Sequence, residues 1–180
     1  MTDKLAVFFP GQGYTCQEDL IKGCIDIYQA KGYKTVILDF GGITFSKDQA
    51  FSLDYEKVKP LLKSKLAPFF DQRYKDLVFV SKSFGTLCAV HADQDFILPA
   101  RHLFLTPLPE TLALIQDETQ IIAMVIGSQD RFLAAQTMLD FCSKRHIQAL
   151  LFEGTGHRLK YPDDNIKTAK LNQQIFELCA

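Results

Sequence analysis

Residues 77–85 read LVFVSKSFG and hold the most informative transition in the chain. Residues 77–80 are apolar throughout, which is typical of a short strand buried on both faces of a parallel sheet. The small and polar residues from Ser81 to Gly85 predict a sharp turn, and the segment after it predicts a helix over residues 83–92. The stretch therefore predicts a strand, a turn and a helix in immediate succession.

The same succession recurs along the whole chain. It predicts an α/β fold with about six strands in a mostly parallel sheet, helices on both faces and right-handed crossovers. The expected strands cover residues 5–9, 35–40, 77–80, 102–105, 121–126 and 149–152. The expected helices cover residues 16–30, 54–70, 83–92, 108–115, 131–145 and 164–178. Asp163 or Asp164 is expected to cap the last helix.

Length, charge and apolar runs predict the number of domains and argue against several classes of partner. A chain of 180 residues without an internal repeat or linker predicts a single domain over residues 1–180. The net charge of −1, with no run of Lys or Arg, argues against a nucleic-acid partner. The apolar run at residues 5–9 is too short for a signal peptide, and the run at residues 121–126 is far short of a membrane span. We therefore expect no membrane partner.

The cysteines indicate the redox compartment. There are five, an odd number, and none is arranged in C-x-x-C spacing. This pattern disfavours both a disulfide framework and a zinc site, so we expect reduced thiols in a cytoplasmic protein. The sequence does not predict an oligomeric state.

Candidates for chemistry are the residues that follow each expected strand, because ligands of open α/β sheets bind beyond the carboxyl ends of the strands. Ser83 follows the third strand, Asp130 the fifth and His157 the sixth. Ser83 has the small residues Ser81 and Gly85 two positions before and after it, which leaves room for a tight turn that exposes its hydroxyl. Ser81 is a rival nucleophile, and a serine here could instead cap the following helix.

Asp130 and His157 also have structural alternatives. Asp130 could accept the Nδ1–H of a histidine, or it could cap a helix that starts at Arg131. His157 lies in a glycine-containing loop, and its ordinary pKa of about 6.5 suits a general base, although exposed loop histidines are common. The candidates reinforce one another because they occur in the order Ser, Asp, His, each after an expected strand.

In these residues the chain resembles the α/β-hydrolase family, whose nucleophile, acid and base follow in that order. Residues 81–85 are similar to the G-x-S-x-G nucleophile elbow, with serine in place of the first glycine. Residues 127–130 and 154–157 are similar to the strand ends that carry the acid and the base. The resemblance implies a catalytic triad of Ser83, Asp130 and His157.

The resemblance also implies an oxyanion hole. One donor would be the backbone N–H of Phe84, the residue after the nucleophile. The second would be the N–H of Gln12, in the loop at residues 10–14, with Gly13 or Tyr14 as alternative donors. This loop is similar to the family's H-G-x-G loop, with Pro10 in place of the histidine.

The implied function is that of a serine hydrolase that cleaves a small carboxylic ester or thioester through an acyl-enzyme, without a metal or organic cofactor. Residues 106–115 are too few for a cap domain, so the chain looks like a minimal, cap-less core similar to dienelactone hydrolases or acyl thioesterases. From topology we expect Phe45, Phe84 and Leu108 to line an acyl pocket.

Several charged or titratable residues near these candidates are expected to be structural. Lys82, Arg131 and Arg158 adjoin the three triad candidates and are expected to be solvated, with selection of an anionic substrate as the alternative. His102 flanks a strand and is expected at the surface.

Two other functions remain open. The departures at Ser81 and Pro10 would suit a non-catalytic α/β-hydrolase-like binding module. The Gly11-Gln12-Gly13 sequence after the first strand partly imitates the phosphate-binding turn of a Rossmann-like nucleotide-binding protein. That fingerprint would need a third glycine where the chain has Cys16, and it leaves the Ser, Asp and His residues without a role.

Overall fold

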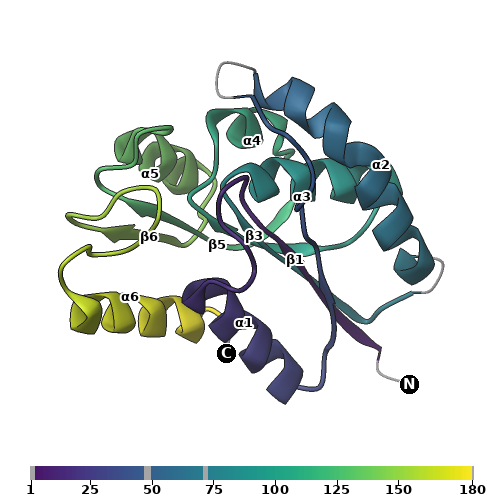
Figure 1. Ribbon diagram of the computed structural model, residues 1–180, viewed down its shortest axis with the longest axis horizontal. Coiled ribbons are helices and arrows are strands. Elements are labelled where there is room, and N and C mark those ends of the chain that lie inside the picture. The colour runs from purple at the N-terminus through teal and green to yellow at the C-terminus, as the bar shows by residue number, and fades with distance from the viewer. Residues whose placement is uncertain (1–2, 47–49, 71–72, 180) are drawn as a thin grey trace.

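The computed structural model describes residues 3–46, 50–70 and 73–179. The strands are β1 (Lys4–Phe9), β2 (Lys34–Ile37), β3 (Asp76–Lys82), β4 (Arg101–Leu105), β5 (Gln120–Gly127) and β6 (Ala149–Phe152). The helices are α1 (Asp19–Ala30), α2 (Phe51–Phe70), α3 (Phe84–Phe96), α4 (Pro109–Leu114), α5 (Ala135–Lys144) and α6 (Asn165–Glu177). The strands form one sheet in the order β2-β1-β3-β4-β5-β6, and all neighbours are parallel (Figure 1). The predicted six-stranded parallel α/β fold is confirmed.

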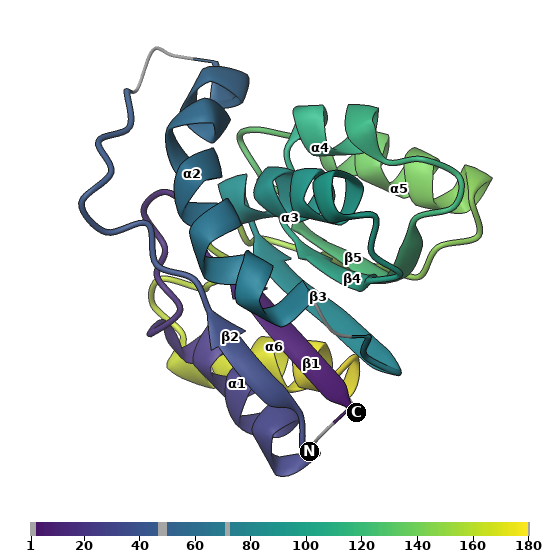
Figure 2. The ribbon, with the colours of Figure 1, turned by 90° about the vertical axis from the view of Figure 1, so that its right-hand side faces the viewer.

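Helices cover both faces of the sheet. In Figure 2, α1 and α6 lie on one face, and α2, α3, α4 and α5 lie on the other. The residues of β1 show why its sequence is continuously apolar. Ala6 and Phe8 belong to the core shared with α1 and α6, whereas Leu5, Val7 and Phe9 belong to the core shared with α2 and α3. Because successive side chains of a strand point to opposite faces, a strand covered on both sides needs an apolar residue at every position.

Two polar residues of the sheet are buried, contrary to expectation. β3 continues through Lys82, two residues beyond its expected end, and Lys82 pairs with Leu105 of β4. The expectation that His102 lies at the surface is wrong, since its side chain is fully buried and its Nε2 lies 3.1 Å from Asp93 Oδ2. β2, at the edge of the sheet, ends at Ile37 rather than at residue 40. The burial of Lys82 and His102 depends on the neighbouring elements that cover them, which local sequence does not encode.

Two aspartates that follow β5 and β6 accept hydrogen bonds from backbone N–H groups. Asp130 Oδ1 accepts hydrogen bonds from the N–H groups of Phe132 and Leu133, at 2.9 and 3.4 Å. These bonds belong to a turn that precedes the helix, and α5 begins at Ala135 rather than at residue 131. Asp164 caps α6 as expected, because its Oδ1 accepts from the N–H of Lys167 at 2.8 Å.

Three further expectations concern a cap domain, the cysteines and membrane-spanning helices. Between β4 and β5 the chain contains the short helix α4, so no cap is inserted there. All five cysteines are buried and unpaired. No helix in the described ranges has both the length and the apolar character that crossing a bilayer requires.

Candidate active site

Ser83 occupies the turn between β3 and α3. Its backbone has φ 54° and ψ −124°, a positive-φ conformation that a non-glycine residue adopts only at a cost in free energy. Gly85 is required two positions later, because a Cβ there would lie 2.4 Å from the carbonyl oxygens of Phe9 and Pro10. Ser81 is fully buried within the sheet, with its hydroxyl 3.5 Å from Leu103 O, so a substrate cannot reach it. Of the two serines, Ser83 is the accessible one.

The structure brings the three sequence candidates together. His157 Nε2 lies 2.6 Å from Ser83 Oγ, and His157 Nδ1 lies 2.7 Å from Asp130 Oδ2. The side chain of Asp130 is 0% exposed. An ionised carboxylate can only accept hydrogen bonds, so His157 donates its Nδ1 proton to Asp130 and accepts the Ser83 hydroxyl proton at Nε2. Asp130 Oδ1 is held by the turn at residues 130–133, which fixes the carboxylate and, through it, the imidazole ring.

The protonation states suit proton transfer. Burial lowers the pKa of His157 below its ordinary value, against the opposing effect of the hydrogen bond that His157 donates to Asp130, and the Lys82 charge adds to the lowering. Burial alone would raise the pKa of Asp130, but hydrogen bonds from His157 and from the Phe132 N–H outweigh it and hold this pKa below the usual value. Near neutral pH the imidazole is therefore neutral and the carboxylate is ionised.

Lys82, expected to be a solvated charge, is instead 1% exposed. Its Nζ donates hydrogen bonds to Thr106 Oγ1 at 2.7 Å and to the carbonyl oxygen of His157 at 2.6 Å. The same nitrogen lies 4.8 Å from the centre of the Tyr14 ring. Burial lowers the pKa of Lys82 to about 7. The sequence did not predict that Lys82 holds the loop of His157. The contact arises because β3 extends through Lys82, which brings its side chain to that loop.

The loop at residues 10–14 lies against the Ser83 turn. A Cβ added to Gly11 would meet Ser83 Cβ at 3.2 Å and Lys82 O at 3.6 Å, so the loop backbone passes close to the nucleophile candidate. The loop is closed by a 3.0 Å hydrogen bond from Gly11 N–H to Tyr14 O. Phe84 is the first residue of α3, where a backbone N–H has no acceptor within the helix.

Gln12 is anchored by a residue that the sequence did not single out. Its side-chain amide donates to Asp54 Oδ2 at 2.7 Å, and Asp54, on α2, is 1% exposed. Asp54 Oδ1 also pairs with Lys57 Nζ at 3.0 Å. This buried carboxylate ties the position of the Gln12 backbone to α2. No local signal distinguishes Asp54 from the other acidic residues of the chain.

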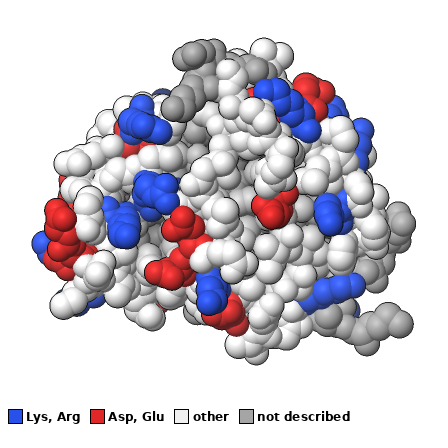
Figure 3. Space-filling model, viewed as in Figure 1, with Lys and Arg blue, Asp and Glu red and all other residues white. Residues whose placement is uncertain are grey.

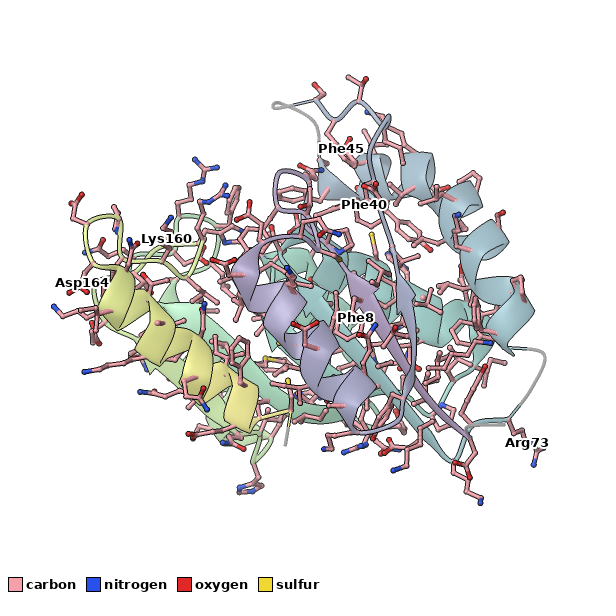
Figure 4. The ribbon with its side chains drawn as sticks, turned by 60° about the horizontal axis from the view of Figure 1, so that its bottom comes forward. Phe8, Phe40, Phe45, Arg73, Lys160 and Asp164 are labelled. Carbon is pink, nitrogen blue, oxygen red and sulfur yellow. The ribbon has the colours of Figure 1, made fainter. Side chains whose placement is uncertain are left out.

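Ser83 and His157 open into a cavity of about 520 Å³. Its apolar wall consists of Phe51 and Phe132, whose ring centres are 5.9 Å apart, and the Phe132 ring centre lies 4.5 Å from that of His157. Phe45, Phe84 and Leu108, which were expected to line an acyl pocket, are not among the residues that line this cavity, so that expectation is wrong. Phe84 and Leu108 are fully buried. Phe45 lies on the segment between β2 and α2 (Figure 4). Its ring packs against that of Phe84, with centres 5.3 Å apart.

The fold is shared with solved structures. The chain superposes with a TM-score of 0.67 and 13% identity on a protein assigned to the α/β-hydrolase superfamily from Xanthomonas campestris pv. campestris, over 97% of both chains. For a serine hydrolase homologue from Coxiella burnetii the TM-score is 0.68 at 16% identity, over 99% of this chain and 86% of that one. For Est1E from Butyrivibrio proteoclasticus, solved with ferulic acid bound, it is 0.65 at 14% identity, over 97% and 89%.

These identities are low enough that the likeness establishes the fold alone. The chain has the α/β-hydrolase fold, in a form that the Xanthomonas campestris protein matches along almost its whole length. No protein-family model matches the sequence, and no curated protein sequence matches it either.

Proposed function

We propose that the protein is a serine hydrolase that cleaves a carboxylic ester or thioester through a covalent acyl-enzyme. The observation that carries the proposal is the continuous hydrogen-bonded chain from Ser83 Oγ through His157 to Asp130, which opens into a cavity. The α/β-hydrolase-superfamily protein and the serine hydrolase homologue among the structures of the same fold support it. The five buried, unpaired cysteines are compatible with a reducing cytoplasm, and a cytoplasmic location is part of the proposal.

The acylation step follows from the geometry of Ser83 and His157. His157 Nε2 takes the hydroxyl proton while Ser83 Oγ attacks the carbonyl carbon of the substrate. The backbone N–H groups of Phe84 and Gln12 donate to the oxyanion that forms on the carbonyl oxygen. His157 then returns its proton to the departing alcohol or thiol, and the acyl group stays on Ser83.

Deacylation uses the same groups in the same roles. His157 takes a proton from a water molecule, and the resulting hydroxide attacks the acyl carbon. The proton passes back to Ser83 Oγ as the carboxylic acid leaves. Asp130 stabilises the imidazolium in both steps without taking up its proton.

Hydrolysis of a short-chain para-nitrophenyl ester tests the proposal. We expect Ser83→Ala and His157→Ala each to lower kcat by several orders of magnitude while the proteins remain folded. The matched control is Ser81→Ala, two residues before Ser83, which removes a buried hydroxyl and should retain activity. A folded wild-type protein that cleaves neither esters nor thioesters would falsify the proposal and favour a non-catalytic binding module.

A further inference from the structure

The cavity beside Ser83 has an unbalanced charge. Its lining includes four basic side chains and no Asp or Glu. The chain as a whole has 20 Lys and Arg against 21 Asp and Glu, and Figure 3 shows both signs interspersed over one face of the molecule. The basic residues of the cavity are Lys82, Arg131, Arg158 and Lys160. An excess of one charge in a cleft selects ligands of the opposite charge.

The four basic side chains differ in how much charge they offer a ligand. Lys82 is buried and hydrogen-bonded to Thr106 and His157, and Arg158 pairs with Glu18 at 3.1 Å. Arg131 and Lys160 have no carboxylate within ion-pair distance in the part of the chain that the structure describes. These two side chains are therefore available to pair with a ligand.

Arg131 and Lys160 line the same cavity as Ser83 and His157. Arg131 follows Asp130 directly, and its guanidinium carbon lies 4.7 Å from the centre of the Phe132 ring, which contacts the His157 ring by its edge. The charge of Arg131 also contributes to the lowered pKa of His157. Lys160 lies on the loop that leads from His157 to α6 (Figure 4).

We infer that the substrate is an ester or thioester that carries an anionic group, a carboxylate or a phosphate, which Arg131 and Lys160 bind while the carbonyl meets Ser83. The inference rests on the proposed hydrolase function and names its substrate class. The apolar wall of Phe51 and Phe132 accommodates a short carbon chain between the carbonyl and the anionic group. Of the three basic residues next to the triad candidates in the sequence, only Arg131 takes this role, which was the alternative to simple solvation.

Matched ester pairs test the inference. In the first pair the charge is on the acyl side, with para-nitrophenyl butyrate against the mono-para-nitrophenyl ester of glutarate. In the second pair the charge is on the leaving group, with phenyl butyrate against its para-carboxyphenyl analogue. A third pair replaces the carboxylate by a phosphate. We expect kcat/KM for at least one anionic ester to exceed that of its neutral partner by about fivefold or more at low salt. The ratio should fall towards one as sodium chloride is raised to about 0.5 M.

Two variants assign the effect to named residues. The double variant Arg131→Gln, Lys160→Gln should lower the anionic-to-neutral ratio of kcat/KM by about fivefold or more. Lys63→Gln, a control at an exposed position of α2 away from the cavity, should leave the ratio unchanged. Cleavage of neutral esters with a ratio near one for every pair overturns the inference and leaves the proposed function intact.

Calorimetric binding to Ser83→Ala separates recognition from catalysis. If the wild-type protein cleaves none of the esters, the proposed function fails. Binding of the esters to Ser83→Ala then decides whether the cavity selects anions. A preference of Ser83→Ala for the anionic esters that is lost on adding Arg131→Gln and Lys160→Gln upholds an anion-binding cavity. Equal or undetectable binding of anionic and neutral esters overturns it.

Discussion

The Nζ of Lys82 donates a 2.6 Å hydrogen bond to the backbone carbonyl oxygen of His157. The residue before the nucleophile candidate thus holds the loop that carries the base candidate. Thr106 Oγ1, just beyond the end of β4, accepts a second hydrogen bond from the same nitrogen. A buried amine therefore joins three strand ends at the point where the proposed chemistry occurs.

Lys82 predicts a dependence of stability on pH. Burial lowers its pKa in the folded protein from 10.5 to about 7. Between these two pH values the unfolded chain binds a proton that the folded protein has released, so the free energy of unfolding attributable to Lys82 rises with pH across this window. Urea unfolding of wild type and Lys82→Met at several pH values between 7 and 9 measures the effect, because other titrating groups cancel in the difference. Parallel pH dependences in the two proteins would contradict the burial of this amine.

The proposed base predicts the acidic limb of the pH–activity profile. A general base must be neutral, so kcat/KM falls as pH drops through the pKa of His157. Because this pKa is lowered, the half-maximal point should lie below about 6.5. Asp130→Asn should reduce kcat by about three to four orders of magnitude and move the limb to still lower pH, since it removes a group that raises the His157 pKa. A half-maximal point above the ordinary histidine value would contradict the assignment.

Gly85→Ala should destabilise the protein severely. The added Cβ would lie 2.4 Å from two backbone carbonyl oxygens, which cannot move aside as a flexible side chain could. We expect a loss of at least about 2 to 3 kcal/mol in the free energy of unfolding, measured with urea. Gly13→Ala is the matched control, because a Cβ there meets nothing within 4 Å. Equal stability of the two variants would show that the Ser83 turn is not packed as described.

The hydrogen bond between Gln12 and Asp54 predicts that a substitution on α2, which is not among the triad candidates, lowers kcat. Asp54→Asn weakens the anchor of the loop that supplies the second proposed oxyanion donor. Loss of an oxyanion-hole donor lowers kcat by about two to three orders of magnitude. A donor that is only less firmly held should therefore lower kcat by about tenfold, with a smaller change in KM. Asp95→Asn, whose carboxylate faces Tyr55 instead, is the control. Unchanged kcat in Asp54→Asn would remove the loop from the proposed oxyanion hole.

Local sequence predicted the sheet well, because strands covered on both faces must be apolar at every position, as β1 is. It also selected Ser83, Asp130 and His157, since each follows a strand and parallel strands end at one edge of the sheet. It failed where the outcome depends on which elements pack together. The burial of Lys82, the contact between Gln12 and Asp54, and the apolar wall of Phe51 and Phe132 all join segments that lie far apart in the chain.

Covalent labelling tests the role of Ser83 most directly. The folded protein is treated with a fluorophosphonate, which phosphonylates only serines activated by a neighbouring base, and the adduct is mapped by mass spectrometry of peptides. We predict one adduct, on Ser83, that is retained in Ser81→Ala and absent from Ser83→Ala and His157→Ala. An unlabelled folded protein, or an adduct that persists in His157→Ala, would contradict the proposed nucleophile and base.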